Sequence, residues 1–178
     1  MQKCFMLHKD RVPDLVLYEV WDRIVDSGTE RVTFSGGEAA DHHSFRDLVR
    51  KDCNEMFLGF YEGVPMAVGW LNDVRDHSAK AHFTIFREGW GRKRDELSPG
   101  VKLARYFAAS LLRNGVLDVL IGYVPVRNRL AVHFMEKVGA QRVGVLPKGA
   151  WMHDTQKSED VQILAITEEM TEEAWLLY

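Results

Sequence analysis

The spacing of apolar residues changes along the chain, and these changes predict where helices and strands lie. Apolar positions between Val12 and Asp26 follow a period close to 3.6 and stop at Ser27-Gly28, which predicts an amphipathic helix. Ser44 to Lys51 predicts a short second helix with Ser44 as its N-cap, and the polar residues 35–43 predict a loop between them. The first part of the chain is therefore expected to be helical.

A strand pattern follows in the middle of the chain. Met56 to Tyr61 and Val64 to Leu71 are separated by Glu62-Gly63, which predicts a β-hairpin. Ala79 to Phe86 is expected to form a third strand beside it, and Cys4 to Leu7 a short strand ahead of the first helix. These segments predict a sheet in which neighbouring strands are mostly antiparallel.

Helices and strands are then expected to alternate through the second half of the chain. Val101 to Arg113 carries one apolar stripe and ends at Asn114-Gly115, as expected for a helix. Val116 to Val124 is almost wholly apolar, which predicts a strand buried on both faces. The last two strands are expected at Gln141 to Leu146 and Val161 to Ile166.

Between these strands, Asn128 is the expected cap of one more helix. Its buried face is predicted to consist of Leu130, Ala131, Phe134, Met135 and Val138, and Gly139 is expected to end it. The complete order of elements predicts an α/β (α+β) fold with a mixed, mostly antiparallel sheet flanked by helices, not a regular doubly wound one. The 178 residues are most simply one domain, 1–178.

Composition narrows the class of protein. The net charge of -3 argues against a general nucleic-acid binder. No apolar run approaches the roughly 18 residues of a membrane helix, and charge interrupts the first ten residues too soon for a signal peptide. A cytoplasmic protein is therefore expected. Seven scattered histidines and two cysteines show no metal-ligand spacing, so no metal is expected.

The segment after the third middle strand has the composition of a phosphate-binding loop. It reads Arg87-Glu88-Gly89-Trp90-Gly91-Arg92-Lys93-Arg94 and combines glycines with four cations. Glycine lets an anion approach the backbone, and free amides and the dipole at a helix N-terminus favour negative charge. A solvated cationic loop is the alternative explanation. If the loop does bind phosphates, the amides involved are those at 89–93 or those near Gly100.

Three segments together resemble the GNAT superfamily of acyl-CoA-dependent N-acetyltransferases. The loop 87–91 is similar to the family's Arg/Gln-x-x-Gly-x-Gly/Ala pyrophosphate loop. Asn128-x-x-Ala131-x-x-Phe134 with Gly139-Ala140 is similar to its Asn-x-x-Ala-x-x-hydrophobic-Tyr-x-x-x-Gly-Phe pattern. The hairpin of residues 57–71 resembles the family's second and third strands. Three departures stand out, namely the long insertion 93–100, Met135 in place of the tyrosine that often acts as the acid, and Ala140 in place of an aromatic residue.

The resemblance implies a fold, a co-substrate and a set of site residues. It implies a splayed strand pair that admits the pantetheine arm of acetyl-CoA, and an amine acceptor, small molecule or protein, that the sequence does not identify. A homodimer is one candidate assembly. The residues implied to bind acetyl-CoA are Thr84, Ile85, Phe86, Arg87, Gly89, Trp90, Gly91, Arg92, Lys93, Arg94, Gly100 and Asn128.

Candidate catalytic residues follow from their place on the strands. His82 shares a strand face with Thr84 and is the candidate base, with strand packing as the alternative. Tyr123, near the end of the next strand, is the candidate acid, again with packing as the alternative. The main reading is acetyl transfer to an amine; the competing ones are a non-catalytic CoA- or partner-binding protein, which Met135 favours, and another nucleotide binder.

Overall fold

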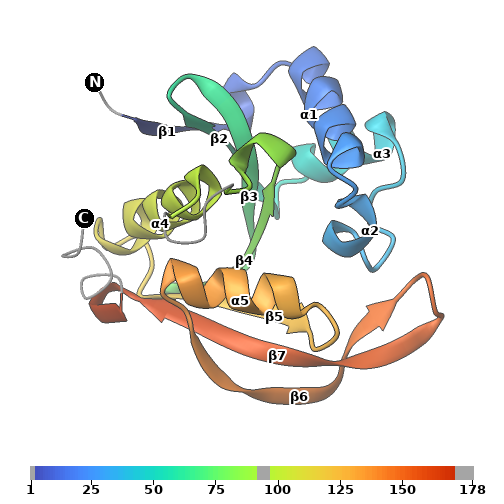
Figure 1. The fold of residues 1–178 in the computed structure, drawn as a ribbon, viewed down its shortest axis with the longest axis vertical. Helices are drawn as coiled ribbons and strands as arrows, with labels where there is room; N and C mark the ends of the chain where they lie inside the picture. The colour runs from blue at the N-terminus through green and yellow to red at the C-terminus, as the bar shows by residue number, and fades with distance from the viewer. Residues whose placement is uncertain (1–2, 92–96, 171–178) are drawn as a thin grey trace.

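Six strand pairings, five antiparallel and one parallel, join seven strands into one sheet (Figure 1). The computed structural model describes residues 3–91 and 97–170. In spatial order the strands are β1 Cys4–His8, β2 Glu55–Tyr61, β3 Val64–Arg75, β4 Ser78–Ile85, β5 Val119–Pro125, β7 Lys157–Thr167 and β6 Gln141–Met152. This mixed, mostly antiparallel α/β sheet confirms the predicted fold class.

Helices cover the sheet on both faces and bury two hydrophobic layers (Figure 1). Against one face pack α4 and α5, which bury the layer that contains Phe107, Leu120 and Leu164. Against the other pack α1 and α3, which bury Leu17, Phe45 and Val68. The helix bounds are α1 Asp14–Asp26, α2 Glu30–Thr33, α3 His42–Arg50, α4 Pro99–Leu112 and α5 Arg129–Val138, with 3₁₀ turns at Lys9–Arg11 and Arg87–Gly89. None of the helices in the described ranges is long and apolar enough to cross a membrane.

The β-hairpin predicted at Glu62-Gly63 is present between β2 and β3. Glu62 and Gly63 have φ values of 51° and 82°. A two-residue loop with positive φ at both positions matches the right-handed twist of the flanking strands. The predicted strands at Cys4–Leu7 and Ala79–Phe86 are also confirmed, as β1 and β4.

Strands β4 and β5 separate after a short parallel contact. Their register joins only Ser78–Lys80 to Val119–Ile121. Beyond that point β4 continues to Ile85 and β5 to Pro125 without pairing to each other, while each keeps its antiparallel neighbour on the other side. The splayed strand pair implied by the resemblance is therefore present, and it places an opening in the middle of the sheet.

The N-terminal helices differ from the prediction in two places. α3 begins at His42 and its N-cap is Asp41, whose side chain accepts a hydrogen bond from the Ser44 amide. Ser44 instead stands at the third helical position, and its hydroxyl oxygen accepts from the Asp41 amide, which completes a capping box. The short helix α2 was not predicted, because four residues are too few for an apolar period to be visible.

Two predictions in the second half were wrong about burial. Strand β5 starts at Val119 and is not buried on both faces, because Tyr123 remains 39% exposed where β4 has separated from it. On α5, Leu130 is 85% exposed and Val132 is buried in its place. The prediction therefore placed an apolar stripe on the correct helix, but in the first turn it named Leu130 as buried where Val132 is the buried residue.

Candidate functional site

The opening between β4 and β5 exposes backbone groups of β4. Phe86 donates its amide to the Met66 carbonyl on β3 at 2.8 Å. Because alternate residues of a strand direct their backbone groups to opposite neighbours, the amides of Phe83 and Ile85 point the other way, toward β5. Pairing with β5 stops at Lys80, so these two amides face the opening. They are donors placed for an extended polar chain or a developing oxyanion.

Of the three strand-end residues predicted to bind the cofactor, Ile85 is the one that faces the opening through its backbone. The Thr84 hydroxyl is 2.9 Å from the hydroxyl of Thr33 on α2, and Thr84 is buried. Phe86 is fully buried in the layer under α1 and α3. Thr84 and Phe86 therefore hold the strand in place, and Phe83 is the second donor that the sequence did not indicate.

His82 lies on the α1–α3 face of β4, stacked on an aromatic neighbour. Its ring is 4.8 Å from the Trp70 ring with an interplanar angle of 2°, and its Nε2 is 3.2 Å from Asn72 Oδ1. Burial, with a smaller contribution from the Lys80 ammonium and against the opposing effect of Asp73, lowers the pKa of His82 from 6.5 to about 4. The imidazole is therefore neutral throughout the neutral pH range and can accept a proton there.

The lowered pKa of His82 makes the stability of the fold depend on pH. The unfolded chain gains a proton below about 6.5 and the folded one only near 4, so stability is lost as pH falls through this window. Between pH 7 and 5 the loss due to His82 is about 2 kcal/mol. Urea denaturation at both pH values should show that His82→Gln loses less stability than the wild type. His77→Gln, at an exposed turn position, should behave like the wild type.

Tyr123, the candidate acid, lies on the same face of the sheet across the opening. The Lys80 ammonium is 4.9 Å from the centroid of its ring and 3.2 Å from Asp73 Oδ2. The structure thus brings Lys80, His82 and Tyr123 to one side of the opening.

The loop after β4 is tied to α1 and to β4 itself. Its Arg87 amide donates to Ser27 Oγ at 2.9 Å, and Arg23 on α1 donates to Glu88 at 2.8 Å. The Trp90 indole donates to the Ile85 carbonyl at 3.1 Å. The predicted phosphate ligands Arg92, Lys93 and Arg94 lie outside the described residues.

The glycines of this segment are required by close packing. A Cβ at Gly89 would lie 2.5 Å from Ile85 Cγ2, and one at Gly100 would lie 2.6 Å from the same atom and 3.0 Å from the Gly89 carbonyl oxygen. A Cβ at Gly91 would lie 2.8 Å from Ser98 Cβ. The absence of side chains lets the loop, the end of β4 and the start of α4 touch one another.

The N-terminus of α4 has few free amides. Ser98 is its N-cap and accepts from the Val101 amide at 3.3 Å, while Pro99 at the first helical position has no N–H. Gly100 is therefore the first-turn residue of α4 whose amide is left for an anion. This places the contribution of α4 to a phosphate site at a single residue.

Asn128 and Met135 have clear structural roles on α5. Asn128 Oδ1 accepts from the Ala131 amide at 3.1 Å, as its predicted cap function requires. Met135 packs against the α4–α5 layer, and its Cε lies 3.2 Å from the position of a Cβ on Gly122. Where the family often has a tyrosine acid, this helix therefore presents an apolar side chain.

Solved structures match this chain, whereas family models and curated sequences do not. No protein-family model matches the chain, and no curated protein matches it. Many solved structures do match it. One is RimL, a ribosomal-protein α-N-acetyltransferase in complex with coenzyme A (TM-score 0.73, 11% identity, covering 94% of this chain and 95% of that one). Others are a ribosomal-protein-alanine acetyltransferase from Vibrio fischeri (0.69, 7%, 95% and 95%) and a spermidine N-acetyltransferase from Vibrio cholerae in complex with CoA and spermine (0.67, 15%, 96% and 98%).

The chain has the GNAT fold. Identities this low establish the arrangement of elements and no more. The GNAT fold accounts for the splayed strands, and it covers nearly the whole chain, including the first third, where no motif had been identified.

Acidic residues on the loops, which could attract a cationic amine, are mostly engaged within the fold. Asp154 and Glu159 on the β6–β7 hairpin pair with Arg127, at 3.0 and 3.3 Å. Asp160 accepts from the Lys148 amide, and Asp41 caps α3. The segment 147–154 forms the twisted end of this hairpin, where the His153 amide donates to the Ser35 carbonyl at 2.8 Å. That contact brings the hairpin to the loop after α2.

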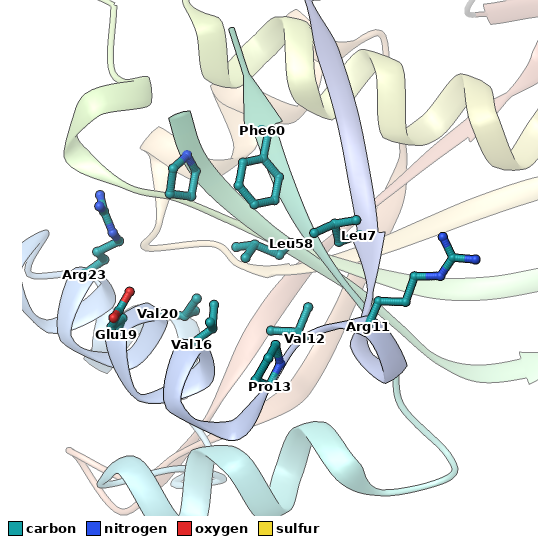
Figure 2. Close-up of a pocket in the computed structure, with 11 residues that line it drawn as sticks. Leu7, Arg11, Val12, Pro13, Val16, Glu19, Val20, Arg23, Leu58 and Phe60 are labelled. Carbon is teal, nitrogen blue, oxygen red and sulfur yellow. The ribbon is translucent and has the colours of Figure 1, made fainter. Parts of the chain in front are cut away.

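A cavity of about 290 Å³ lies apart from this opening (Figure 2). Figure 2 shows Val16 and Val20 of α1 facing Leu58 and Phe60 of β2 across it. Strand β3 separates β2 from β4 in the sheet, so the cavity is not the space between β4 and β5. Among the described residues no group of three or more His, Cys, Asp or Glu side chains is placed to hold a metal ion.

Sequence reasoning missed the residues that surround His82. Trp70 is its direct cross-strand partner, and Asn72 lies two residues further along β3. The register of a β3–β4 pairing would have placed Trp70 beside His82, but a turn of uncertain length separates the two strands in the sequence. Thr33 gave no signal, because Thr84, the partner of its hydroxyl, lies far along the chain.

Proposed function

We propose that the protein is an N-acetyltransferase that moves an acetyl group from acetyl-CoA to an amine by direct attack in a ternary complex. The observation that carries the proposal is the opening between β4 and β5, with the Phe83 and Ile85 amides directed into it. The GNAT fold and the CoA in two solved neighbours support it. Those neighbours are a spermidine and a protein acetyltransferase, so the acceptor is a small amine or a protein amine.

The residues present fit acetyl-CoA in an extended conformation. An amide on β4 would hold the thioester carbonyl oxygen as negative charge develops on it, which lowers the barrier to attack. His82 would take the proton of the attacking amine at Nδ1, because its Nε2 donates to Asn72 Oδ1. Acetyl-CoA supplies the activated acyl group, and its thiolate, with a pKa of about 8.5, leaves with or without a proton from Tyr123.

The phosphates would lie where the loop after β4 meets the N-terminus of α4. Arg87 supplies a cation on this loop, and the sequence carries three more at Arg92, Lys93 and Arg94. The glycine contacts keep the loop backbone close to Gly100. Asn128 has its Oδ1 bound to the helix, which leaves its Nδ2 group to donate to the cofactor arm. Homodimer formation and a cytoplasmic location stay predictions.

A second candidate function is a non-catalytic CoA- or partner-binding protein on the same fold. The observation that favours it is Met135, which fills with apolar packing the position where the family often has its acid. In that case the protein would bind acetyl-CoA without transferring its acetyl group.

Calorimetric titration with acetyl-CoA, ATP and NAD distinguishes these functions. We expect saturable binding of acetyl-CoA and none of ATP or NAD at the same concentrations. Thiol release in the presence of a panel of primary amines should then report transfer. Acetyl-CoA binding without thiol release would favour the non-catalytic alternative, and preferential binding of ATP or NAD would reject both.

A further inference from the structure

Helix α5 lines the opening between β4 and β5 on one side, and two adjacent residues of it contact the two separated strands. Phe134 stacks on Phe83 of β4, with ring centroids 6.2 Å apart and an interplanar angle of 19°. Met135 contacts β5, where its Cε lies 3.2 Å from the position of a Cβ on Gly122. Both side chains are only partly buried. The α5 side of the opening is therefore lined by an aromatic ring and a thioether side chain.

Gly122 marks the end of the opening where β4 and β5 come together. The last pair in their register is Lys80 with Ile121, so Gly122 is the first β5 residue beyond it. Continued by one residue, this register puts Gly122 level with Ala81, which packs against the same layer as Met135. Because glycine has no Cβ, the space beside the β5 backbone here belongs to Met135. The Cε of Met135 therefore lies at the paired end of the opening.

The other end of the opening is where the proposed phosphate site lies, at the loop after β4 and the start of α4. Acetyl-CoA that binds there would run back along β4, with its acyl group ahead of the thioester. Of the two amides that face the opening, that of Phe83 is nearer to the paired end. It is two residues from Ala81, about 7 Å along the strand. An acyl group held at this amide would thus point toward the Cε of Met135.

We propose that Met135 sets the length of the acyl group that the protein accepts and restricts it to acetyl. This inference rests on the proposed function. An apolar pocket distinguishes ligands by volume, and one methylene group changes the discrimination by about tenfold or more. A longer acyl chain would have to displace the Met135 side chain from Gly122, whereas the methyl group of acetyl would not. Met135 is then a specificity-determining residue that acts through its volume.

Acetyl-CoA and butyryl-CoA are a matched pair of probes, because they differ only in the length of the acyl chain. Titrated calorimetrically into the full chain, acetyl-CoA should bind the wild type about tenfold or more tightly than butyryl-CoA. Met135→Ala removes Cγ, Sδ and Cε and should remove most of this difference, mainly through tighter binding of butyryl-CoA. Met135→Leu conserves the volume of the side chain and should keep the preference.

Met6→Ala is a control with matched packing. The Sδ of Met6 lies 3.1 Å from the position of a Cβ on Gly59, so here too a methionine packs on a strand glycine. Gly59 belongs to β2, which pairs with β1 on one side and with β3 on the other. This variant loses the same atoms away from the opening and should keep the wild-type preference for acetyl-CoA. Thermal melting checks that each variant is folded.

The possible outcomes separate this inference from the proposed function. Equal binding of the two thioesters by the wild type, or a preference that Met135→Ala leaves unchanged, would overturn the role of Met135 even though CoA thioesters bind. A preference lost equally in Met6→Ala would assign it to the packing of the whole core and would also overturn this role. If Met135→Ala does not fold, Met135→Val is the smaller truncation and should weaken the preference in the same direction. A wild-type protein that binds neither acetyl-CoA nor CoA would overturn the proposed function, and this inference with it.

Discussion

Replacing His82 with alanine should lower the turnover of amine acetylation by about 100-fold or more, with little change in acetyl-CoA affinity. The imidazole faces the α1–α3 side of the opening, where an acceptor would approach, and its low pKa keeps it unprotonated at neutral pH. Its place on β4 is close to the amides that would hold the thioester carbonyl. Steady-state rates of thiol release, measured with acetyl-CoA saturating, test the expectation.

Two further variants separate catalysis from packing. Alanine removes the ring that stacks on Trp70, so His82→Gln serves as a second variant that keeps a polar side chain of similar length. His77→Ala, at an exposed position, is the matched control and should retain full turnover. If His82→Gln and His82→Ala both keep most of the wild-type rate while folded, His82 is a packing residue and the base lies elsewhere.

The environment of His82 also revises the pH dependence that its residue type implies. An ordinary imidazole would give a rate that rises through about pH 6.5. Burial and the nearby Lys80 ammonium lower the pKa to about 4. Titration of His82 should therefore not change the rate near neutral pH. The same shift makes His82 a weaker base. Its contribution then depends on how closely the attacking nitrogen is held.

Most of the strand order was predictable because the determinants are local. The Glu62-Gly63 turn, the alternation along β4 and the cap at Asn128 act over a few residues, and the structure confirms each. The prediction for β5 failed because its exposure depends on where β4 leaves it. An apolar run cannot show whether the next strand in space continues beside it, and Tyr123 is exposed for that reason.

The candidate site was harder to predict from the sequence, because contacts between residues far apart in the chain define it. His82 could be named from its residue type, but its partners Trp70 and Asn72 come from another strand. The backbone donors at Phe83 and Ile85 follow from strand pairing, so no side-chain pattern could indicate them.

Gly100→Ala should lower acetyl-CoA affinity by about tenfold or more while the protein remains folded. The new Cβ would lie 2.6 Å from Ile85 Cγ2, closer than real Cβ contacts, and 3.0 Å from the Gly89 carbonyl oxygen, tighter than most of them. The contact must open, which moves the loop after β4 away from the Gly100 amide in the first turn of α4. Overpacking of this kind costs about 1–3 kcal/mol of stability. Calorimetric titration of acetyl-CoA measures the affinity, and urea denaturation confirms the fold.

A compensating substitution makes the steric cause of this loss testable. Ile85→Ala removes the methyl groups that the new Cβ would strike, so the double variant should bind acetyl-CoA more tightly than Gly100→Ala alone, a coupling that independent effects would not show. Gly144→Ala adds a Cβ where no atom lies within 4 Å and should change neither affinity nor stability by much. Unchanged affinity in a destabilised Gly100→Ala protein would place the pyrophosphate away from α4. The cations of the loop after β4 would then have to bind it without help from the helix, because the packing of Gly100 would serve the fold alone.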